Sequence, residues 1–313
     1  MADLRDLWRD GLRETVLASV FFLPQTRRTR LNRWLRGREE ARKVDLADVC
    51  FMSIGKSGRT WLRLMVSRFY QLRYGVPEGT LLEFDNLHRR DARLPRVFWS
   101  HSNYIRDYTG HWDDKRDFYG KRVLLLARDP RDIAVSQYHQ WQHRMRPVKK
   151  LINDYPPHGA DVSLWDFVLS PSVGLPAILA WMQLWERELP KCAGGEVVRY
   201  EDMRADPEDA LARTLAFLGT PGDAEAIREA VAYAAYDNMK KIEQDHVFRG
   251  SGNRLLPGDR ANPDSYKVRR AKVGGYRDDF TPEQVAELDA LVVATTPPLF
   301  GYNAERARRA AQV

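Results

Sequence analysis

The stretch that decides the fold is Val49-Cys50-Phe51-Met52-Ser53-Ile54-Gly55-Lys56-Ser57-Gly58-Arg59-Thr60-Trp61. Residues 49–54 form a short apolar run that is typical of a buried parallel strand. After Trp61, apolar residues recur at helical spacing as far as Tyr70. A strand, a glycine-containing loop and a helix in this order direct several backbone N–H groups and the positive helix end at one anion. The segment therefore predicts an α/β fold with an anion site at its loop.

The loop differs from the common nucleoside-triphosphate loop. That motif requires a glycine five residues before Gly55, and Cys50 stands at that position. We expect an anion site of another kind, in which the Lys56 side chain adds a positive charge and Ser57 and Thr60 add hydroxyl donors. A strand–helix turn that binds no ligand is the alternative interpretation.

A second apolar run, residues 123–127, leads into Arg128-Asp129-Pro130-Arg131-Asp132 and then a helical pattern. Pro130 fits near a helix start, where its missing N–H costs nothing. Arg128 follows a parallel strand directly, which is where open α/β sheets bind ligands. Ser136 comes about two turns later, so we expect it to face the same anion. Two anion sites at strand ends indicate a ligand with two separated phosphate-like groups.

A third apolar run, residues 97–100, ends at His101. An imidazole at a strand end can take a proton from an acceptor hydroxyl near neutral pH. A single histidine is more often a structural residue, so the catalytic interpretation depends on the neighbouring motifs.

Together these motifs resemble, in cytosolic-type order, those of the sulfotransferases that use 3′-phosphoadenosine 5′-phosphosulfate (PAPS) and release adenosine 3′,5′-bisphosphate (PAP). The resemblance implies a three-layer, P-loop-like α/β fold with a central parallel sheet flanked by helices. The matching segments are Lys56–Trp61 (the 5′-phosphosulfate loop), His101 (the catalytic-base position), Arg128 with Ser136 (the 3′-phosphate motif), Val198–Met203 (the Tyr-Glu-Asp-Met strand), and Met239–Lys241 and Val268–Arg277 (late cofactor segments).

The resemblance implies an enzyme of EC 2.8.2 type that moves the sulfuryl group of PAPS in line to a hydroxyl of a small-molecule, lipid or carbohydrate acceptor. It needs no metal. His101 would be the general base, and Lys56 would neutralise the charge on the leaving 5′-phosphate. The cofactor-binding residues that the resemblance implies are Lys56, Ser57, Gly58, Arg59, Thr60, Trp61, Arg128, Ser136, Tyr200, Tyr236, Met239, Arg269, Arg270 and Ala271.

Within this set, Trp61 and Tyr236 fall at the family's adenine-stacking positions. The chain also departs from the family pattern. Trp99 stands where many cytosolic members have lysine, two residues before the base, and Arg59 replaces a threonine of the loop. The first departure leaves open how the catalytic pair is assisted. Smaller departures are Ala234, Ala235, Ala271, Gly275 and Tyr276.

The charge of the chain is concentrated in one segment. The 313 residues carry a formal net charge of +7, and residues 27–43 contain eight Lys/Arg and two Glu, a net of +6. The rest is almost neutral, so the composition does not predict a nucleic-acid-binding surface. Two cysteines exclude a disulfide framework and favour a reducing, cytoplasmic compartment.

Residues 1–43 are predicted to form a basic amphipathic arm before a sulfotransferase domain at 44–313. Apolar residues between Leu4 and Phe21 recur at helical spacing, and Pro24 is expected to end that helix. The apolar run is too short to span a bilayer and lacks the features of a secretory signal. Two interpretations stay open: the arm packs on the body or on a second copy, or it docks peripherally on the anionic inner face of the membrane.

Three segments match the family least and are expected to choose the acceptor: residues 84–94, 144–172 and 245–266. The last is rich in glycine and proline and is predicted to be a mobile lid. The alternative functions are a P-loop-like ATP-dependent kinase and a catalytically silent PAP-binding or membrane-associated scaffold.

Overall fold

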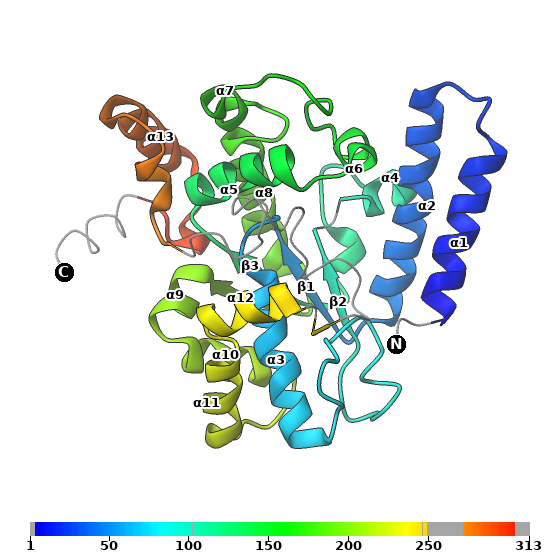
Figure 1. Ribbon diagram of the computed structural model, residues 1–313, viewed down its shortest axis with the longest axis vertical. Helices are drawn as coiled ribbons and strands as arrows, with labels where there is room; N and C mark the ends of the chain where they lie inside the picture. Colours follow the sequence, from blue (N-terminus) through cyan, green and yellow to red (C-terminus); the bar gives the residue numbers. More distant parts are fainter. Residues whose placement is uncertain (1–3, 102, 246, 249–271, 304–313) are drawn as a thin grey trace.

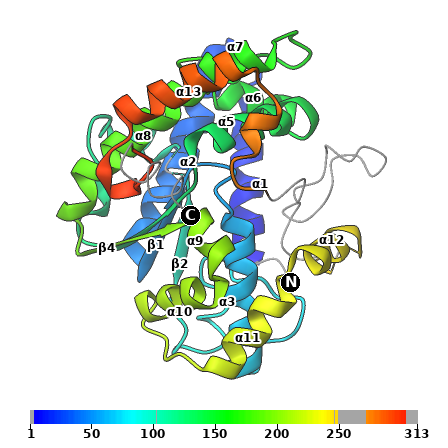
Figure 2. The ribbon, with the colours of Figure 1, turned by 90° about the vertical axis from the view of Figure 1, so that its left-hand side faces the viewer.

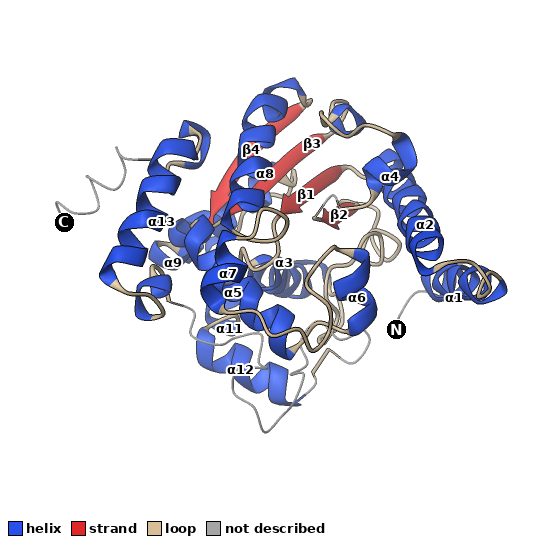
Figure 3. Ribbon diagram, turned by 90° about the horizontal axis from the view of Figure 1, so that it is seen from above, coloured by secondary structure: helices blue, strands red, loops and turns tan. Residues whose placement is uncertain are grey.

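A computed structural model describes residues 4–101, 103–245, 247–248 and 272–303. Its centre is a parallel sheet of four strands in the order β2-β1-β3-β4. The strands are β1 (Val49–Ser53), β2 (Val97–Ser100), β3 (Arg122–Ala127) and β4 (Gly194–Arg199). Figure 1 labels the first three, and Figure 3 shows all four side by side. The first three coincide with the apolar runs of the sequence, so the predicted central sheet is confirmed.

Both faces of the sheet are covered, because its strands are apolar at successive positions. Phe51 and Leu124 contribute to the core on one face, whereas Cys50 and Leu125 contribute to the core on the other. Successive side chains of a strand point to opposite faces, so a continuous apolar run requires a layer of helices on each side.

The helices supply these two layers. Helices α3, α10 and α11 gather on one side and α7, α8 and α13 on the other, with the strands between them (Figure 2). The three-layer α/β architecture implied by the family resemblance is therefore confirmed. The helices are α1 (Leu4–Ser19), α2 (Gln25–Leu46), α3 (Arg59–Tyr74), α4 (Ile105–Thr109), α5 (Pro130–His143), α6 (Pro147–Ile152), α7 (Leu164–Leu169), α8 (Leu175–Glu188), α9 (Tyr200–Ala205), α10 (Pro207–Phe217), α11 (Ala224–Tyr233), α12 (Tyr236–Asp245) and α13 (Pro282–Thr295).

The N-terminal arm consists of two helices, α1 and α2, that lie side by side at one edge of the molecule (Figures 1 and 3). α1 ends at Ser19, earlier than expected, and Pro24 instead precedes α2, where its fixed φ suits a helix start. α2 spans the whole basic segment and packs on the body: a Cβ on Gly37 would lie 2.2 Å from the Tyr104 carbonyl oxygen. No helix among the described residues has the length and apolar character needed to cross a bilayer.

The Tyr-Glu-Asp-Met segment is helical and not a strand. β4 ends at Arg199, and α9 begins at Tyr200. Glu201 and Asp202 lie in the first turn of α9, where negative side chains stabilise the positive end of a helix. The prediction of a strand over Val198–Met203 is therefore right for Val198 and Arg199 and wrong from Tyr200 onward.

Candidate active site

A cavity of about 540 Å³ opens where β1 and β3 end. It is lined by the loop after β1, the segments after β2 and β3, and parts of α5, α9, α11 and α12. The predicted site residues that line it are Lys56, Gly58, Arg59, Thr60, Trp61, His101, Arg128, Ser136, Tyr200, Tyr236 and Met239. Arg269, Arg270, Ala271 and most of the predicted lid lie outside the described residues.

The loop after β1 has the backbone geometry of an anion-binding turn. Lys56 has φ 75° and Gly58 has φ 90°, both in the left-handed region, and α3 begins directly afterwards. This conformation turns the chain sharply from strand to helix, so that the positive start of α3 faces the cavity. A Cβ on Gly58 would lie 2.7 Å from Cδ2 of Tyr200, so only glycine fits between the loop and this ring.

Ser57 contributes differently from the expectation. It is fully buried and is not among the lining residues, and its hydroxyl donates to the Ile54 carbonyl oxygen at 3.0 Å. The hydroxyl therefore holds the loop against the end of β1 in this structure. Thr60, by contrast, lines the cavity.

Arg128 joins the second motif to the first. Its Nη1 donates to the Lys56 carbonyl oxygen at 3.2 Å and its Nη2 to the Lys272 carbonyl oxygen at 3.1 Å. The guanidinium also lies 4.5 Å from the centre of the Tyr200 ring. Its buried Nε has no hydrogen-bond partner among the described residues. A half-buried cation with an unused donor, beside the loop of Lys56, fits a phosphate oxygen.

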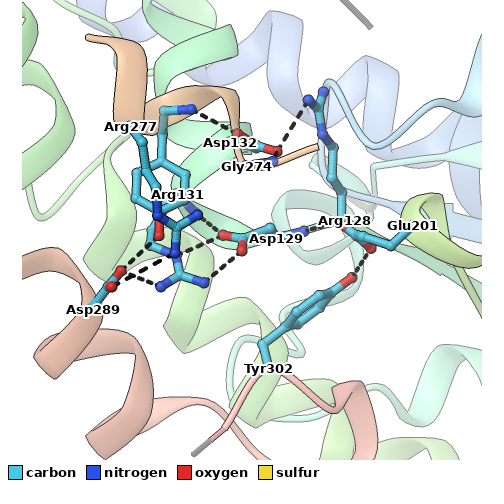
Figure 4. A network of polar contacts seen from close by, with 10 residues as sticks. Arg128, Asp129, Arg131, Asp132, Glu201, Gly274, Arg277, Asp289 and Tyr302 are labelled. Atoms are coloured by element: carbon cyan, nitrogen blue, oxygen red, sulfur yellow. Dashed lines mark hydrogen bonds and ion pairs between the residues drawn. The ribbon is translucent and has the colours of Figure 1, made fainter. Parts of the chain in front are cut away.

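Asp132 holds the late segment against this motif. Its carboxylate accepts from the backbone N–H groups of Gly274 at 2.9 Å and Tyr276 at 3.0 Å, and lies 3.5 Å from Arg128 (Figure 4). Burial raises the pKa of Asp132, and the nearby Arg128 opposes that shift. The segment around residue 274, far away in sequence, is thereby positioned at the cavity.

A second carboxylate fixes the loop of Arg128 from the other side. Glu201 accepts from the backbone N–H of Asp129 at 2.8 Å and from the Tyr302 hydroxyl at 2.6 Å (Figure 4). Arg131 pairs with Asp129 and also with Asp289 on α13. The segment that carries Arg128 is therefore held by contacts from α9 and from the C-terminal part of the chain.

The neighbours of His101 define which of its ring nitrogens carries the proton. Its Nδ1 lies 2.5 Å from the Ser53 carbonyl oxygen, and its Nε2 lies 2.9 Å from Nη2 of Arg59. A carbonyl oxygen only accepts and a guanidinium only donates, so Nδ1 carries the proton and Nε2 carries the lone pair. The lone pair of Nε2 therefore points toward Arg59, and both residues line the cavity.

Glu40 of α2 forms hydrogen bonds with the segments on both sides of His101. The Glu40 carboxylate accepts from the Ser100 hydroxyl at 3.3 Å, from the Tyr104 N–H at 3.1 Å and from the Ile105 N–H at 2.9 Å. Burial raises the pKa of Glu40, and the two backbone hydrogen bonds oppose the shift. The segments on both sides of His101 are thus attached to the N-terminal arm.

An aromatic wall stands beside the loop. The rings of Trp61 and Tyr200 are 5.8 Å apart in an edge-to-face arrangement, and Tyr236 and Met239 line the same cavity. Such apolar faces suit a purine base. Asp132, Val135 and Gln140 also line the cavity and were not among the predicted residues. They share a face of α5 with Ser136, so helical spacing from Ser136 could have indicated them.

The described residues hold no group of His, Cys, Asp and Glu side chains suited to a metal ion. The fold and the cavity define a class: an α/β protein with a cavity at its strand ends that is lined by two cationic motifs. Comparison with known proteins makes this class more specific.

The family model described as "Sulfotransferase domain" matches residues 118–296. The chain is 25% identical to cytosolic sulfotransferase 13 of Arabidopsis thaliana, over 78% of this chain and 75% of that protein. It is 24% identical to 3-beta-hydroxysteroid sulfotransferase of Cavia porcellus, over 95% of this chain and 98% of that one. In structure it resembles mouse sulfotransferase SULT7A1 complexed with PAP, with a TM-score of 0.55 at 18% identity over 88% and 94% of the two chains.

The chain belongs to the sulfotransferase domain family. Its enzyme class is PAPS-dependent sulfuryl transfer, with PAP as the second product. The predicted family, fold and donor are therefore confirmed.

Proposed function

We propose that the chain transfers the sulfuryl group of PAPS to a hydroxyl of a small-molecule, lipid or carbohydrate acceptor, with Lys56 and His101 as the catalytic pair. One observation carries this proposal: Lys56, His101 and Arg128 all line one cavity. A donor whose 5′ end lies at the loop and whose 3′ end lies at Arg128 places its reactive group toward the histidine.

The 3′-phosphate group belongs at Arg128 and Ser136 in this assignment. Arg128 offers a buried N–H with no partner among the described residues, and Ser136 adds a hydroxyl from α5. A guanidinium binds phosphate through several charge-assisted hydrogen bonds. Trp61 and Tyr236 provide faces for the adenine, and Gly58 allows the loop to pass close to Tyr200.

His101 acts as the general base. In the reaction the acceptor O–H gives its proton to Nε2, the acceptor oxygen forms a bond to sulfur, and the bond from sulfur to the bridging oxygen of PAPS breaks. The electron pair of that bond leaves with PAP. Lys56, at the turn of the loop, stabilises the charge that develops on the bridging oxygen. Positioning and charge stabilisation supply the rate.

The names of the relatives indicate only the general class of the acceptor. One relative is named 3-beta-hydroxysteroid sulfotransferase, and another, 23% identical, is flavonol 3-sulfotransferase of Flaveria bidentis. These names favour a hydroxyl-bearing small molecule for this chain as well. Relatives named cytosolic sulfotransferases and the two free cysteines favour a cytoplasmic enzyme.

The test uses purified protein, PAPS and a panel of hydroxyl-bearing acceptors, with PAP release followed by chromatography. We expect PAP to accumulate with at least one acceptor. Calorimetry with PAP and with ATP–Mg²⁺ separates this function from a kinase: tight binding of ATP–Mg²⁺ and none of PAP would refute the sulfotransferase assignment. PAP binding without turnover across the panel would favour the silent scaffold.

The turn between α1 and α2 is exposed, and we propose that it binds an anionic membrane surface. Phe21 and Phe22 are 73% and 70% exposed, and the exposed Arg27, Arg28 and Arg30 follow on the first turns of α2. Exposed aromatic rings next to cations match the boundary between lipid headgroups and acyl chains.

Co-sedimentation with vesicles tests this assignment. We expect binding to phosphatidylcholine vesicles that contain phosphatidylserine, weaker binding to phosphatidylcholine alone, and loss of binding in a Phe21→Ser/Phe22→Ser variant. Binding independent of acidic lipid would contradict it. A protein that stays in solution and dimerises through this turn, measured by light scattering, would show a second copy to be the partner.

A further inference from the structure

The side chain of Arg59 occupies the position that the acceptor must take. Its Nη2 lies 2.9 Å from the Nε2 of His101, and Arg59 lines the cavity. Nε2 has a single lone pair, because Nδ1–H is directed at the Ser53 carbonyl oxygen. The guanidinium and an acceptor hydroxyl cannot both use that lone pair. In the reacting complex the guanidinium must therefore lie elsewhere.

The cavity offers one suitable destination. Arg59 is the first residue of α3, directly after the turn at Gly58, so its backbone belongs to the anion loop itself. The acceptor oxygen must lie between Nε2 and sulfur, and the sulfuryl group must lie between the acceptor and the loop. The sulfuryl oxygens thus fall within reach of a side chain that starts at the loop and ends at Nε2. A planar guanidinium matches the paired oxygens of such an anion.

β2, the strand that precedes His101, supplies no cation that could bind the sulfuryl oxygens. Trp99, two residues before His101, brings no charge: its ring lies 4.2 Å from the Phe51 ring and 4.6 Å from the guanidinium carbon of Arg63. That arginine is buried and lies 3.4 Å from Glu83. Arg59 is the cation that the structure places at the lone pair of the base.

We propose that Arg59 is a catalytic residue whose guanidinium binds the sulfuryl oxygens of PAPS and, in the free enzyme, covers Nε2 of His101. This inference rests on the proposed function and adds an order of events. Binding of PAPS draws the guanidinium from Nε2 to the sulfuryl group, which uncovers the base for the acceptor. The positive charge then stabilises the sulfuryl oxygens while sulfur passes between the two oxygens.

The test compares PAPS with PAP, which differ only in the sulfuryl group. Affinities are measured by calorimetry, without acceptor, for wild type, Arg59→Thr, Arg59→Lys and the control Arg73→Thr. Arg73 lies at the far end of the same helix, 53% exposed and beside Asp223. Thermal melts show whether each variant is folded.

We expect Arg59→Thr to bind PAP within about threefold of wild type and PAPS at least tenfold more weakly, with Arg59→Lys between them and Arg73→Thr unchanged. With an acceptor identified, kcat of Arg59→Thr falls by about a hundredfold. Without the neighbouring cation, the acid limb of its pH–rate profile moves to higher pH, which a structural role would not cause.

A failure of the Arg59 proposal and a failure of the proposed function give different results. A folded Arg59→Thr variant that binds PAPS as tightly as wild type, or that loses PAP and PAPS equally, overturns the role of Arg59 and leaves the proposed function standing. Wild-type protein that binds neither PAPS nor PAP overturns the proposed function itself.

Discussion

The carboxylate of Glu40 and the hydroxyl of Ser100 lie 3.3 Å apart, which joins the basic N-terminal helix to the strand end that carries His101. The same carboxylate accepts from the backbone of Tyr104 and Ile105 beyond the histidine. The arm is therefore attached to the segments on both sides of His101, the proposed general base.

Replacing Glu40 should change how stability depends on pH. Burial raises the pKa of Glu40 above its ordinary value of 4.5, so the folded chain holds the proton more tightly than the unfolded chain. The free energy of unfolding therefore falls as the pH rises from 4.5 through the raised pKa. Glu40→Gln cannot ionise and should lack this fall. Urea unfolding across this range, with Glu39→Gln as a control, measures the difference; parallel curves for wild type and Glu40→Gln would contradict it.

Gly58→Ala should disrupt the anion loop. The new Cβ meets the Tyr200 ring at 2.7 Å, and φ of 90° is strained for any residue with a side chain. We expect PAP affinity to fall at least tenfold and stability to fall by about 1–3 kcal/mol. The control is Gly120→Ala, because a Cβ there meets no atom within 4 Å. Equal behaviour of the two variants in calorimetry and melts would refute this view of the loop.

Arg128→Ala should weaken recognition of the 3′-phosphate selectively. Charge-assisted hydrogen bonds to phosphate contribute about 1.5–3 kcal/mol each, so we expect PAP affinity to fall by roughly ten- to a hundredfold. Affinity for adenosine 5′-phosphate, which lacks the 3′-phosphate, should fall much less. Calorimetry with both nucleotides measures these affinities. Equal losses of affinity for the two nucleotides would show that Arg128 supports the structure of the loop and does not recognise the 3′-phosphate.

The sequence was informative about the sheet and about residues at its strand ends. Buried parallel strands are apolar at nearly every position, and the motif of Lys56 and the motif of Arg128 each follow such a run closely. Contacts that depend on side-chain reach were not predictable. Arg59 and His101 are 42 positions apart, and their meeting depends on the relative placement of β1 and β2.

Two local features were also beyond the sequence pattern. The helix at Tyr200 follows a strand without any glycine or proline to mark the boundary, so the segment was expected to continue as a strand. The buried hydroxyl of Ser57 was expected to point at the ligand, because nothing in the sequence distinguishes a serine that binds an anion from one that closes its own loop.

The most direct test of the central claim is PAP release from PAPS by wild type, Lys56→Ala and His101→Ala, with PAP affinity of each protein measured in parallel. We predict turnover by wild type with at least one hydroxyl acceptor, and a loss of about a hundredfold or more in kcat for His101→Ala with PAP affinity within about threefold of wild type. Lys56→Ala should lose kcat by a similar factor. Full turnover by both variants, or wild-type protein that does not bind PAP, would contradict the account.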